Sequence, residues 1–211
     1  ALMTLKLFNK QLEIFKQRGE NELLSIAFEL EFNFIYVLAS MEQKGIKIDV
    51  KLLKEYKDRS LIYLNELTQN IYEACGESFN INSPKQLGVI LFEKLELASS
   101  KKTKTGYSTD ESVLESLKNE HKVVPLLLKY REAFKLHSTY IEPLLELGLK
   151  DKNSRIFSSF LHTGTTTGRL SSKNPNLQNI PVGAFSDIQI RKAFVASDGY
   201  KLVGVDYSQI E

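Results

Sequence analysis

Apolar residues recur at three- and four-residue steps through the first 150 positions, which is the spacing of amphipathic helices. The pattern predicts one helix over residues 1–18 and, after Gly19, a second over residues 23–44 that stops at Gly45. Alternation of apolar and polar residues at 46–48 then indicates a short strand. The first helix places its apolar face at Leu2, Leu5, Phe8, Leu12 and Phe15.

Capping residues mark the helices that follow. Asp49 is the expected N-cap of a long helix that ends near Gly76. Ser83 and Pro84 fit the cap and the first position of another helix, and Pro125 begins a later one. Residues 1–150 are therefore predicted to be mostly helical.

The pattern changes after about residue 150. Residues 156–161 suggest a strand, and residues 194–196 and 202–205 are two short apolar runs on either side of Asp198-Gly199, a dipeptide typical of hairpin turns. The last sixty residues are therefore expected to begin a sheet. Together the two patterns predict an α+β fold that is mostly helical.

Composition narrows the class of protein. The chain has 211 residues, is 42% hydrophobic and 26% charged, and carries a net charge of +2, so any nucleic-acid surface has to be local. Cys75 is the only cysteine, which excludes an intrachain disulfide and a four-cysteine metal site. No apolar run near the roughly 18 residues of a membrane span stands out, and no signal peptide opens the chain. We expect a cytoplasmic protein and, because the chain starts with Ala and stops at Glu211, a fragment of a larger one.

Asp206 is the first candidate for chemistry. It follows the expected strand over residues 202–205, a position from which a carboxylate can hold Mg²⁺, which prefers hard oxygen ligands. A turn-forming aspartate is the alternative. Glu211, five residues on, is a candidate second ligand or a residue that shapes the substrate pocket, and a solvated helix residue is the alternative there.

A polar segment earlier in the chain is the second candidate. The Arg169 guanidinium can donate two hydrogen bonds at once to phosphate oxygens or to base acceptors. Four amides follow it, and amides suit either base-edge and sugar contacts or a loop that satisfies its own backbone. Both interpretations stay open for Asn174, Asn176, Gln178 and Asn179.

Other constellations are weaker or missing. Lys101, Lys102 and Lys104 form a basic patch that fits either a phosphate-touching tip or a solvated loop. The three histidines are too widely spaced to suggest a metal site, and the sequence contains no Gly-rich phosphate loop and no serine nucleophile elbow.

Three stretches of the chain resemble family A DNA polymerases, the bacterial DNA polymerase I type. They are Thr-Gly-Arg-Leu-Ser-Ser at 167–172, Asn-Pro-Asn-Leu-Gln-Asn-Ile-Pro at 174–181 and Asp-Tyr-Ser-Gln-Ile-Glu at 206–211. Weaker matches at 45–49, 79–87 and 135–140 extend the resemblance over nearly the whole chain.

The resemblance implies a domain plan. Residues 1–22 would be the C-terminal tail of a 3′–5′ exonuclease-like domain, and residues 23–48 a helix and short strand leading into the polymerase domain. Residues 49–150 would form the thumb, a subdomain of long helices. Residues 151–211 would form the first antiparallel strands of the palm, with the motif that carries the first catalytic aspartate.

The resemblance also implies residue roles. Asp206 would be the catalytic aspartate that binds both Mg²⁺ ions, assisted by the backbone carbonyl of Tyr207, and Glu211 would crowd the sugar 2′ position of the incoming dNTP. Arg169 would contact the minor groove at the primer terminus. The remaining expected DNA contacts are Asn174, Gln178 and Asn179 beside the primer–template, and Lys101, Lys102 and Lys104 at the thumb tip.

The implied activity is DNA-directed DNA synthesis in replication or repair, by a monomer that acts on primer–template DNA and dNTPs without a membrane. The family's second catalytic aspartate and its nucleotide-binding finger helix would lie beyond Glu211. Because two-metal nucleotidyl transfer needs more than one carboxylate, this piece alone is expected to be inactive. The alternatives are a relative of single-subunit RNA polymerases and a non-catalytic helical DNA-binding module.

Overall fold

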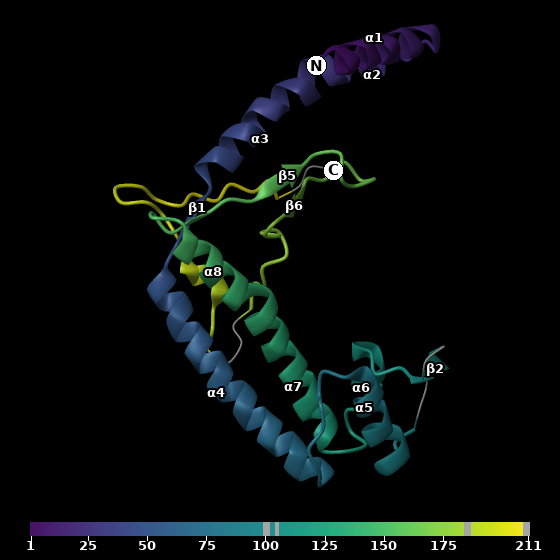
Figure 1. Cartoon of the computed structure of the whole chain (residues 1–211), viewed down its shortest axis with the longest axis vertical. Coiled ribbons are helices and arrows are strands. Elements are labelled where there is room, and N and C mark those ends of the chain that lie inside the picture. Colours follow the sequence, from purple (N-terminus) through teal and green to yellow (C-terminus); the bar gives the residue numbers. More distant parts are fainter. Residues whose placement is uncertain (99–101, 104–105, 184–186, 209–211) are drawn as a thin grey trace. The chain divides into compact units, whose positions relative to one another are not determined.

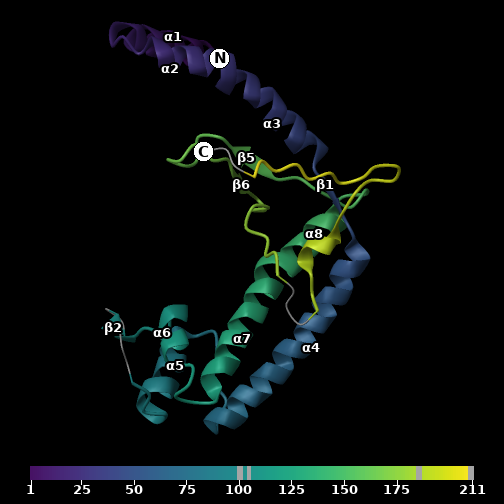
Figure 2. The same cartoon turned by 180° about the vertical axis from the view of Figure 1, so that it is seen from behind.

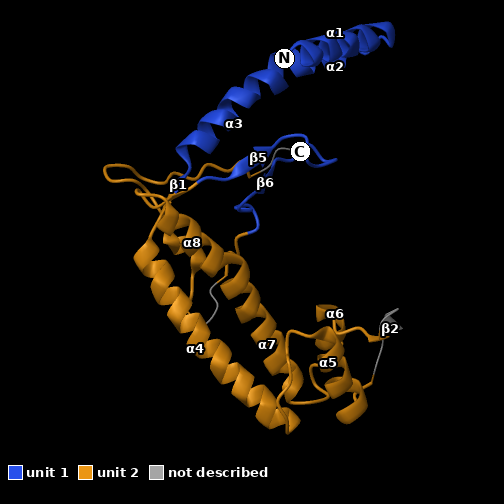
Figure 3. Ribbon diagram, in the orientation of Figure 1, with its two compact units in different colours: residues 1–46, 157–179 blue, residues 47–156, 180–211 orange. Residues whose placement is uncertain are grey.

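The computed structural model describes the whole chain except residues 99–101, 104–105, 184–186 and 209–211. The described part is mostly helical, with a few short antiparallel strands, as the sequence predicts (Figures 1 and 2). It divides into two compact units, each made of two stretches of chain (Figure 3). Unit 1 comprises residues 1–46 and 157–179, and unit 2 comprises residues 47–156 and 180–211.

Unit 1 begins with the two predicted helical segments. Helix α1 (Leu2–Gln17) is followed by a turn at Gly19, whose φ of +73° favours glycine. The second segment is continuous and consists of α2 (Asn21–Ile26), the π-helical turn η1 (Ala27–Glu31) and α3 (Phe32–Lys44). The two segments meet through a cluster of three aromatic rings, Phe8, Phe28 and Phe32.

The second segment is more apolar than expected. An 18-residue stretch within residues 21–44 has a mean hydropathy of 1.5, and 6% of it is buried, so by length and composition this helix could cross a membrane. Glu29 and Glu31 interrupt the apolar residues, which is why the sequence shows no long uninterrupted apolar run here. A single helix of this kind is weak evidence for a membrane span, because core helices of soluble proteins and signal sequences have similar length and composition.

Unit 1 also contains a two-stranded antiparallel ribbon. Strands β5 (Ser159–Leu161) and β6 (Ser171–Lys173) pair with Phe160 opposite Ser172. The expected strand over residues 156–161 is therefore split, since Ile156 belongs to a different sheet. The ribbon carries the Arg169 segment at its connecting loop.

Long helices form the body of unit 2. Helix α4 (Val50–Cys75) begins where the Asp49 carboxylate accepts hydrogen bonds from two backbone amides, and it ends at Gly76 with φ +75°. Beside α4 runs a second continuous helical segment, made of α7 (Val123–Lys135), the π-helical turn η3 (Leu136–Ile141) and α8 (Glu142–Lys150) (Figures 1 and 2). Both predicted ends of α4 are confirmed.

Shorter elements pack against one end of this pair. They are α5 (Pro84–Val89), which the Ser83 hydroxyl caps, the π-helical turn η2 (Ile90–Lys94), the two-residue strands β2 (Lys102–Thr103) and β3 (Gly106–Tyr107), and α6 (Glu111–Ser116). Buried side chains from α4, α5, η2, α6 and α7 form one apolar cluster. Leu87, Leu91, Leu114 and Leu127 are fully buried in it. This cluster is the main core of unit 2.

A small sheet lies at the other end of the long helices. Its order is β4 (Arg155–Ile156), β1 (Ile46–Ile48) and β7 (Phe194–Val195), and a 3-10 turn η4 (Ile190–Ala193) leads into β7. Helix α8 passes so close that a Cβ on Gly148 would lie 2.3 Å from Ile48 Cδ1. A larger residue at Gly148 would therefore need the Ile48 side chain to move.

The expected strand over residues 202–205 is absent. The turn at Asp198-Gly199 forms, but no strand follows it, and Leu202, Val203 and Val205 are exposed. A strand is stable only when its backbone groups pair with a neighbour, and no described residue pairs with this run. The hairpin prediction was therefore wrong at its second strand.

Candidate nucleic-acid interface

Side chains complete the backbone hydrogen bonding of the β5–β6 ribbon on both sides. Opposite residues Phe160 and Ser172 turn their N–H groups away from each other. The Phe160 N–H donates to Glu42 Oε1 of α3 at 2.6 Å, and the Ser172 N–H donates to Gln178 Oε1 at 3.1 Å. Gln178 Nε2 also donates to the Leu170 carbonyl at 2.9 Å. One amide side chain thus does for β6 what a neighbouring strand would do.

The loop between the strands presents Arg169 to solvent. Gly168 takes a φ of +72°, and the hydroxyl of Thr165 donates to the Arg169 carbonyl at 2.7 Å, so the backbone on both sides of the arginine is fixed. The Arg169 side chain is exposed, and within the described part of the chain no acceptor is recorded for its guanidinium. A guanidinium that is open to solvent on a fixed backbone is suited to bind phosphate oxygens or base acceptors.

The four amides that follow Arg169 differ in what they do. Asn176 Oδ1 accepts from the Gln178 backbone N–H at 3.0 Å and from the Ser172 hydroxyl at 3.3 Å. For Asn176 and Gln178 the structure therefore favours the loop that satisfies its own backbone. Asn174 is exposed with φ +58°, a conformation asparagine tolerates, and Asn179 is also exposed. Asn174 is the amide that most resembles Arg169 in being open to a ligand.

Sequence reasoning missed two residues that shape this region. Glu42 of α3 holds the ribbon, as described above. In unit 2, the Arg191 guanidinium donates from Nη2 to the Ile180 carbonyl at 2.9 Å and from Nε to the Pro181 carbonyl at 3.2 Å. Glu42 bonds a strand N–H more than a hundred residues away, and Arg191 bonds two carbonyls in a loop. Neither partner leaves a periodic signal, so neither contact could be predicted from the sequence.

Asp206 lies in an exposed, irregular stretch of unit 2. The sequence predicted that Asp206 follows a buried strand, and this prediction was wrong. Tyr207 beside it is 76% exposed. An open carboxylate and a backbone carbonyl are the hard oxygen donors that Mg²⁺ takes, so the residues fit as part of a magnesium site. No group of three or more His, Cys, Asp or Glu residues gathers around an ion position in the described chain. Among the described residues, Asp206 is therefore a candidate ligand without two further His, Cys, Asp or Glu residues beside it.

Of the remaining candidates, only Lys102 lies within the described residues. Lys101, Lys104 and Glu211 lie outside the described residues, and Lys102 begins strand β2. The Arg169 segment belongs to unit 1 and Asp206 to unit 2, and each is described within its own unit. The structure thus brings together Arg169, Asn174 and Gln178, which share one ribbon and its flanking loop.

Comparison with known proteins assigns the chain to a family. Residues 50–211 match DNA polymerase family A. The chain belongs to this family. DNA polymerase I of Helicobacter pylori strain J99 is 46% identical over 211 residues, which is 99% of this chain and 23% of that protein. DNA polymerase I of Caldicellulosiruptor bescii is 49% identical over 182 residues, or 86% of this chain and 21% of that protein.

A solved structure agrees with this assignment. The POL domain of Pol1 from M. smegmatis, in complex with DNA primer-template and dNTP, is similar over 88% of this chain and 33% of that one. The TM-score is 0.80 at 37% sequence identity. The chain thus spans less than a quarter of the two curated relatives named above. These findings favour the family A reading over an RNA polymerase relative and over an unrelated helical module.

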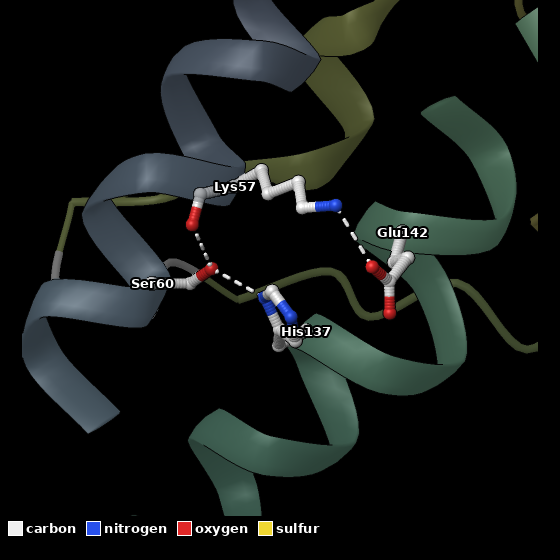
Figure 4. A network of polar contacts seen from close by, with 4 residues as sticks. All are labelled: Lys57, Ser60, His137 and Glu142. Atoms are coloured by element: carbon white, nitrogen blue, oxygen red, sulfur yellow. Dashed lines mark hydrogen bonds and ion pairs between the residues drawn. The ribbon is translucent and has the colours of Figure 1, made fainter. Parts of the chain in front are cut away.

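A serine–histidine pair in the family A body of unit 2 needs a separate explanation (Figure 4). Ser60 Oγ lies 2.7 Å from His137 Nδ1, the distance of a catalytic dyad. The single Ser60 hydroxyl hydrogen, however, is donated to the Lys57 carbonyl at 2.8 Å. In this arrangement Nδ1 carries the proton and donates to Ser60, and His137 is then not a base toward this serine; the opposite tautomer would reverse the bond.

The same network links α4 to the neighbouring helical segment. Lys57 Nζ lies 2.8 Å from Glu142 Oε1, and this hydrogen bond raises the pKa of Lys57 and lowers the pKa of Glu142. Burial lowers the pKa of His137, while Glu142 opposes that shift and Lys57 adds to it. The network is therefore a structural link between helices, with a neutral histidine at its centre.

Proposed function

We propose that this chain is the part of a DNA-directed DNA polymerase that holds primer–template DNA and supplies one metal-binding carboxylate. The complete protein would add dNTPs to a primer 3′-hydroxyl in replication or repair. The observation that carries the proposal is the similarity, at TM-score 0.80 over 88% of this chain, to a POL domain in complex with primer-template and dNTP. We further propose that it acts as a monomer in the cytoplasm.

The contact to DNA is proposed for the Arg169 loop. Its guanidinium is exposed and its backbone is held by Thr165, which supports a contact made without reordering the loop. Asn174, with an exposed amide, would add a second contact. Asn179 and the lysines Lys101, Lys102 and Lys104 remain proposed contacts to the same duplex.

The metal site is proposed for Asp206 and the Tyr207 carbonyl. Magnesium bound there would neutralise charge on the substrate phosphates, and two ions are expected in the complete protein. Glu211 is proposed to exclude the ribose 2′-hydroxyl of ribonucleotides. Because this chain offers one matched catalytic carboxylate, we propose that it binds DNA but does not extend a primer.

Duplex binding by the 211-residue chain tests the first part. Fluorescence anisotropy with a labelled primer–template should give a Kd that rises steeply with salt concentration. Arg169→Ala should weaken binding about tenfold, because it removes a guanidinium contact. Arg18→Ala, which removes another exposed arginine, is the matched control and should stay within about twofold. Equal effects of the two variants would refute the Arg169 contact.

Primer extension tests the second part. The 211-residue chain should show no template-directed incorporation. In the longer protein that contains it, Asp206→Asn should slow incorporation on the order of a thousandfold, because a metal ligand is lost. Asp198→Asn removes an exposed aspartate that pairs with Lys47 and should leave the rate unchanged. Full synthesis by Asp206→Asn would overturn the metal assignment.

A further inference from the structure

Gln178 uses both ends of its amide on the backbone next to Arg169. Its Oε1 accepts from the Ser172 N–H at 3.1 Å, and its Nε2 donates to the Leu170 carbonyl at 2.9 Å. These two backbone groups belong to residues one and three positions after the arginine. A direct contact to DNA through the same oxygen and nitrogen would compete with both bonds.

The neighbouring polar groups reinforce this arrangement. Asn176 Oδ1 accepts from the backbone N–H of Gln178, which fixes where the Gln178 side chain starts. The Ser172 hydroxyl, in a side chain only 5% exposed, donates to Asn176 and accepts from the Leu177 N–H at 2.9 Å. The loop after β6 is thereby folded back against the strand, with Gln178 alongside it.

The carbonyls of Arg169 and Leu170, which belong to two consecutive peptide groups, therefore both accept hydrogen bonds from side chains. Thr165 Oγ1 holds the Arg169 carbonyl at 2.7 Å, and Gln178 Nε2 holds the Leu170 carbonyl. Without these bonds the flexible guanidinium would have to be ordered together with its backbone when it binds. Ordering the backbone on binding costs conformational entropy. In a loop that is already ordered before binding, this cost does not reduce the affinity.

We propose that Gln178 is a positioning residue, which acts on DNA binding through the backbone at Arg169 and makes no essential DNA contact of its own. The inference rests on the proposed function, since it assumes that Arg169 contacts the duplex. It assigns Gln178 a different role from Asn174, whose amide is exposed and for which no partner is recorded among the described residues.

A double-mutant cycle on the 211-residue chain tests the proposal. Gln178→Met keeps the length of the side chain and removes both hydrogen bonds without adding charge. It should weaken primer–template binding about fivefold when Arg169 is present, and less than about twofold in the Arg169→Ala background. Asn174→Ala is the matched control, and its effect should be the same in both backgrounds.

The possible outcomes separate the two levels of the argument. If Arg169→Ala weakens binding and Gln178→Met weakens it equally in both backgrounds, Gln178 contacts DNA directly and the inference fails while the proposed function stands. If Arg169→Ala has no effect, the proposed contact fails and the inference fails with it. If Gln178→Met has no effect in either background, the inference alone fails.

Amide hydrogen exchange gives a readout that does not depend on DNA. Gln178→Met should speed exchange of the Ser172 N–H, and Arg169→Ala should leave it unchanged. Unchanged exchange of the Ser172 N–H in Gln178→Met would show that the hydrogen bond from Ser172 to Gln178 is absent in solution, and would overturn the proposal. Gln178→Ala provides a second variant, and circular dichroism of both should match the parent because Gln178 is exposed and outside the helices.

Discussion

The helical body of residues 50–150 and the stretch over residues 202–207 both contain apolar side chains, but many of those in the first region are buried, whereas those in the second are exposed. In the body, side chains such as Leu53, Leu114 and Leu127 are fully buried. In the later stretch, Val203 is 82% and Val205 84% exposed. Helices complete their hydrogen bonds within themselves, whereas a strand depends on neighbours. Whether a segment can satisfy its own backbone hydrogen bonds, more than its hydrophobicity, decides which part of this chain forms a core.

Truncation of one buried and one exposed side chain gives the largest effect. Leu127→Ala should lower the free energy of unfolding by about 2–5 kcal/mol, because it opens a cavity in the apolar cluster. Val203→Ala should change it by less than about 0.5 kcal/mol. Urea denaturation followed by circular dichroism measures both. A large loss of unfolding free energy in Val203→Ala would mean that residues 202–207 are packed in solution. The two regions would then not differ as described.

Loss of the N-cap of α4 should have a smaller effect on the free energy of unfolding, and it tests whether the helix satisfies its hydrogen bonds locally. Asp49→Ala removes the acceptor of the Lys51 and Leu52 N–H groups and should cost about 0.5–2 kcal/mol of stability. Asp49→Ser keeps a capping oxygen and should recover most of that loss. The same denaturation experiment decides it. If Asp49→Ala and Asp49→Ser are equally stable, the cap does not hold this helix end.

The smallest effect concerns the neutral histidine between the long helices. Because the pKa of His137 is lowered in the folded chain, the unfolded chain binds more protons as pH falls below the ordinary histidine value of about 6.5. Stability should therefore be highest above that pH and fall as the medium is acidified toward the folded-state pKa. Melting temperatures at pH 7.5 and 5.5 measure the fall.

His137→Gln is the control for that experiment. Its amide can still donate to Ser60 but does not titrate over this range, so the melting temperatures at the two pH values should lie closer together than in the parent. If the parent and the variant respond equally to acid, the pH dependence arises elsewhere, for example from the carboxylates.

What could be predicted from the sequence follows the same division. Helix ends at Asp49, Gly76 and Ser83 were predictable because cap and helix are adjacent in the chain. The close approach of Gly148 to Ile48 was not predictable, since the two residues are a hundred positions apart in the chain.

Within the candidate site, the sequence indicated which residue types are present but not which groups their side chains bond to. An exposed Arg169 in a glycine-containing loop was predictable from composition. The sequence left open whether the amides bond to a ligand or to their own loop, because both uses need the same donors and acceptors. In the folded chain the Gln178 amide bonds to its own loop, through the Ser172 N–H and the Leu170 carbonyl.

The capped ribbon has one more consequence. A two-stranded ribbon normally exposes unpaired edges that can recruit further strands from other molecules. Here the Phe160 N–H faces a carboxylate and the Ser172 N–H faces an amide, so an incoming strand would first have to displace Glu42 or Gln178. Glu42 and Gln178 therefore also oppose aggregation through the edges of this ribbon.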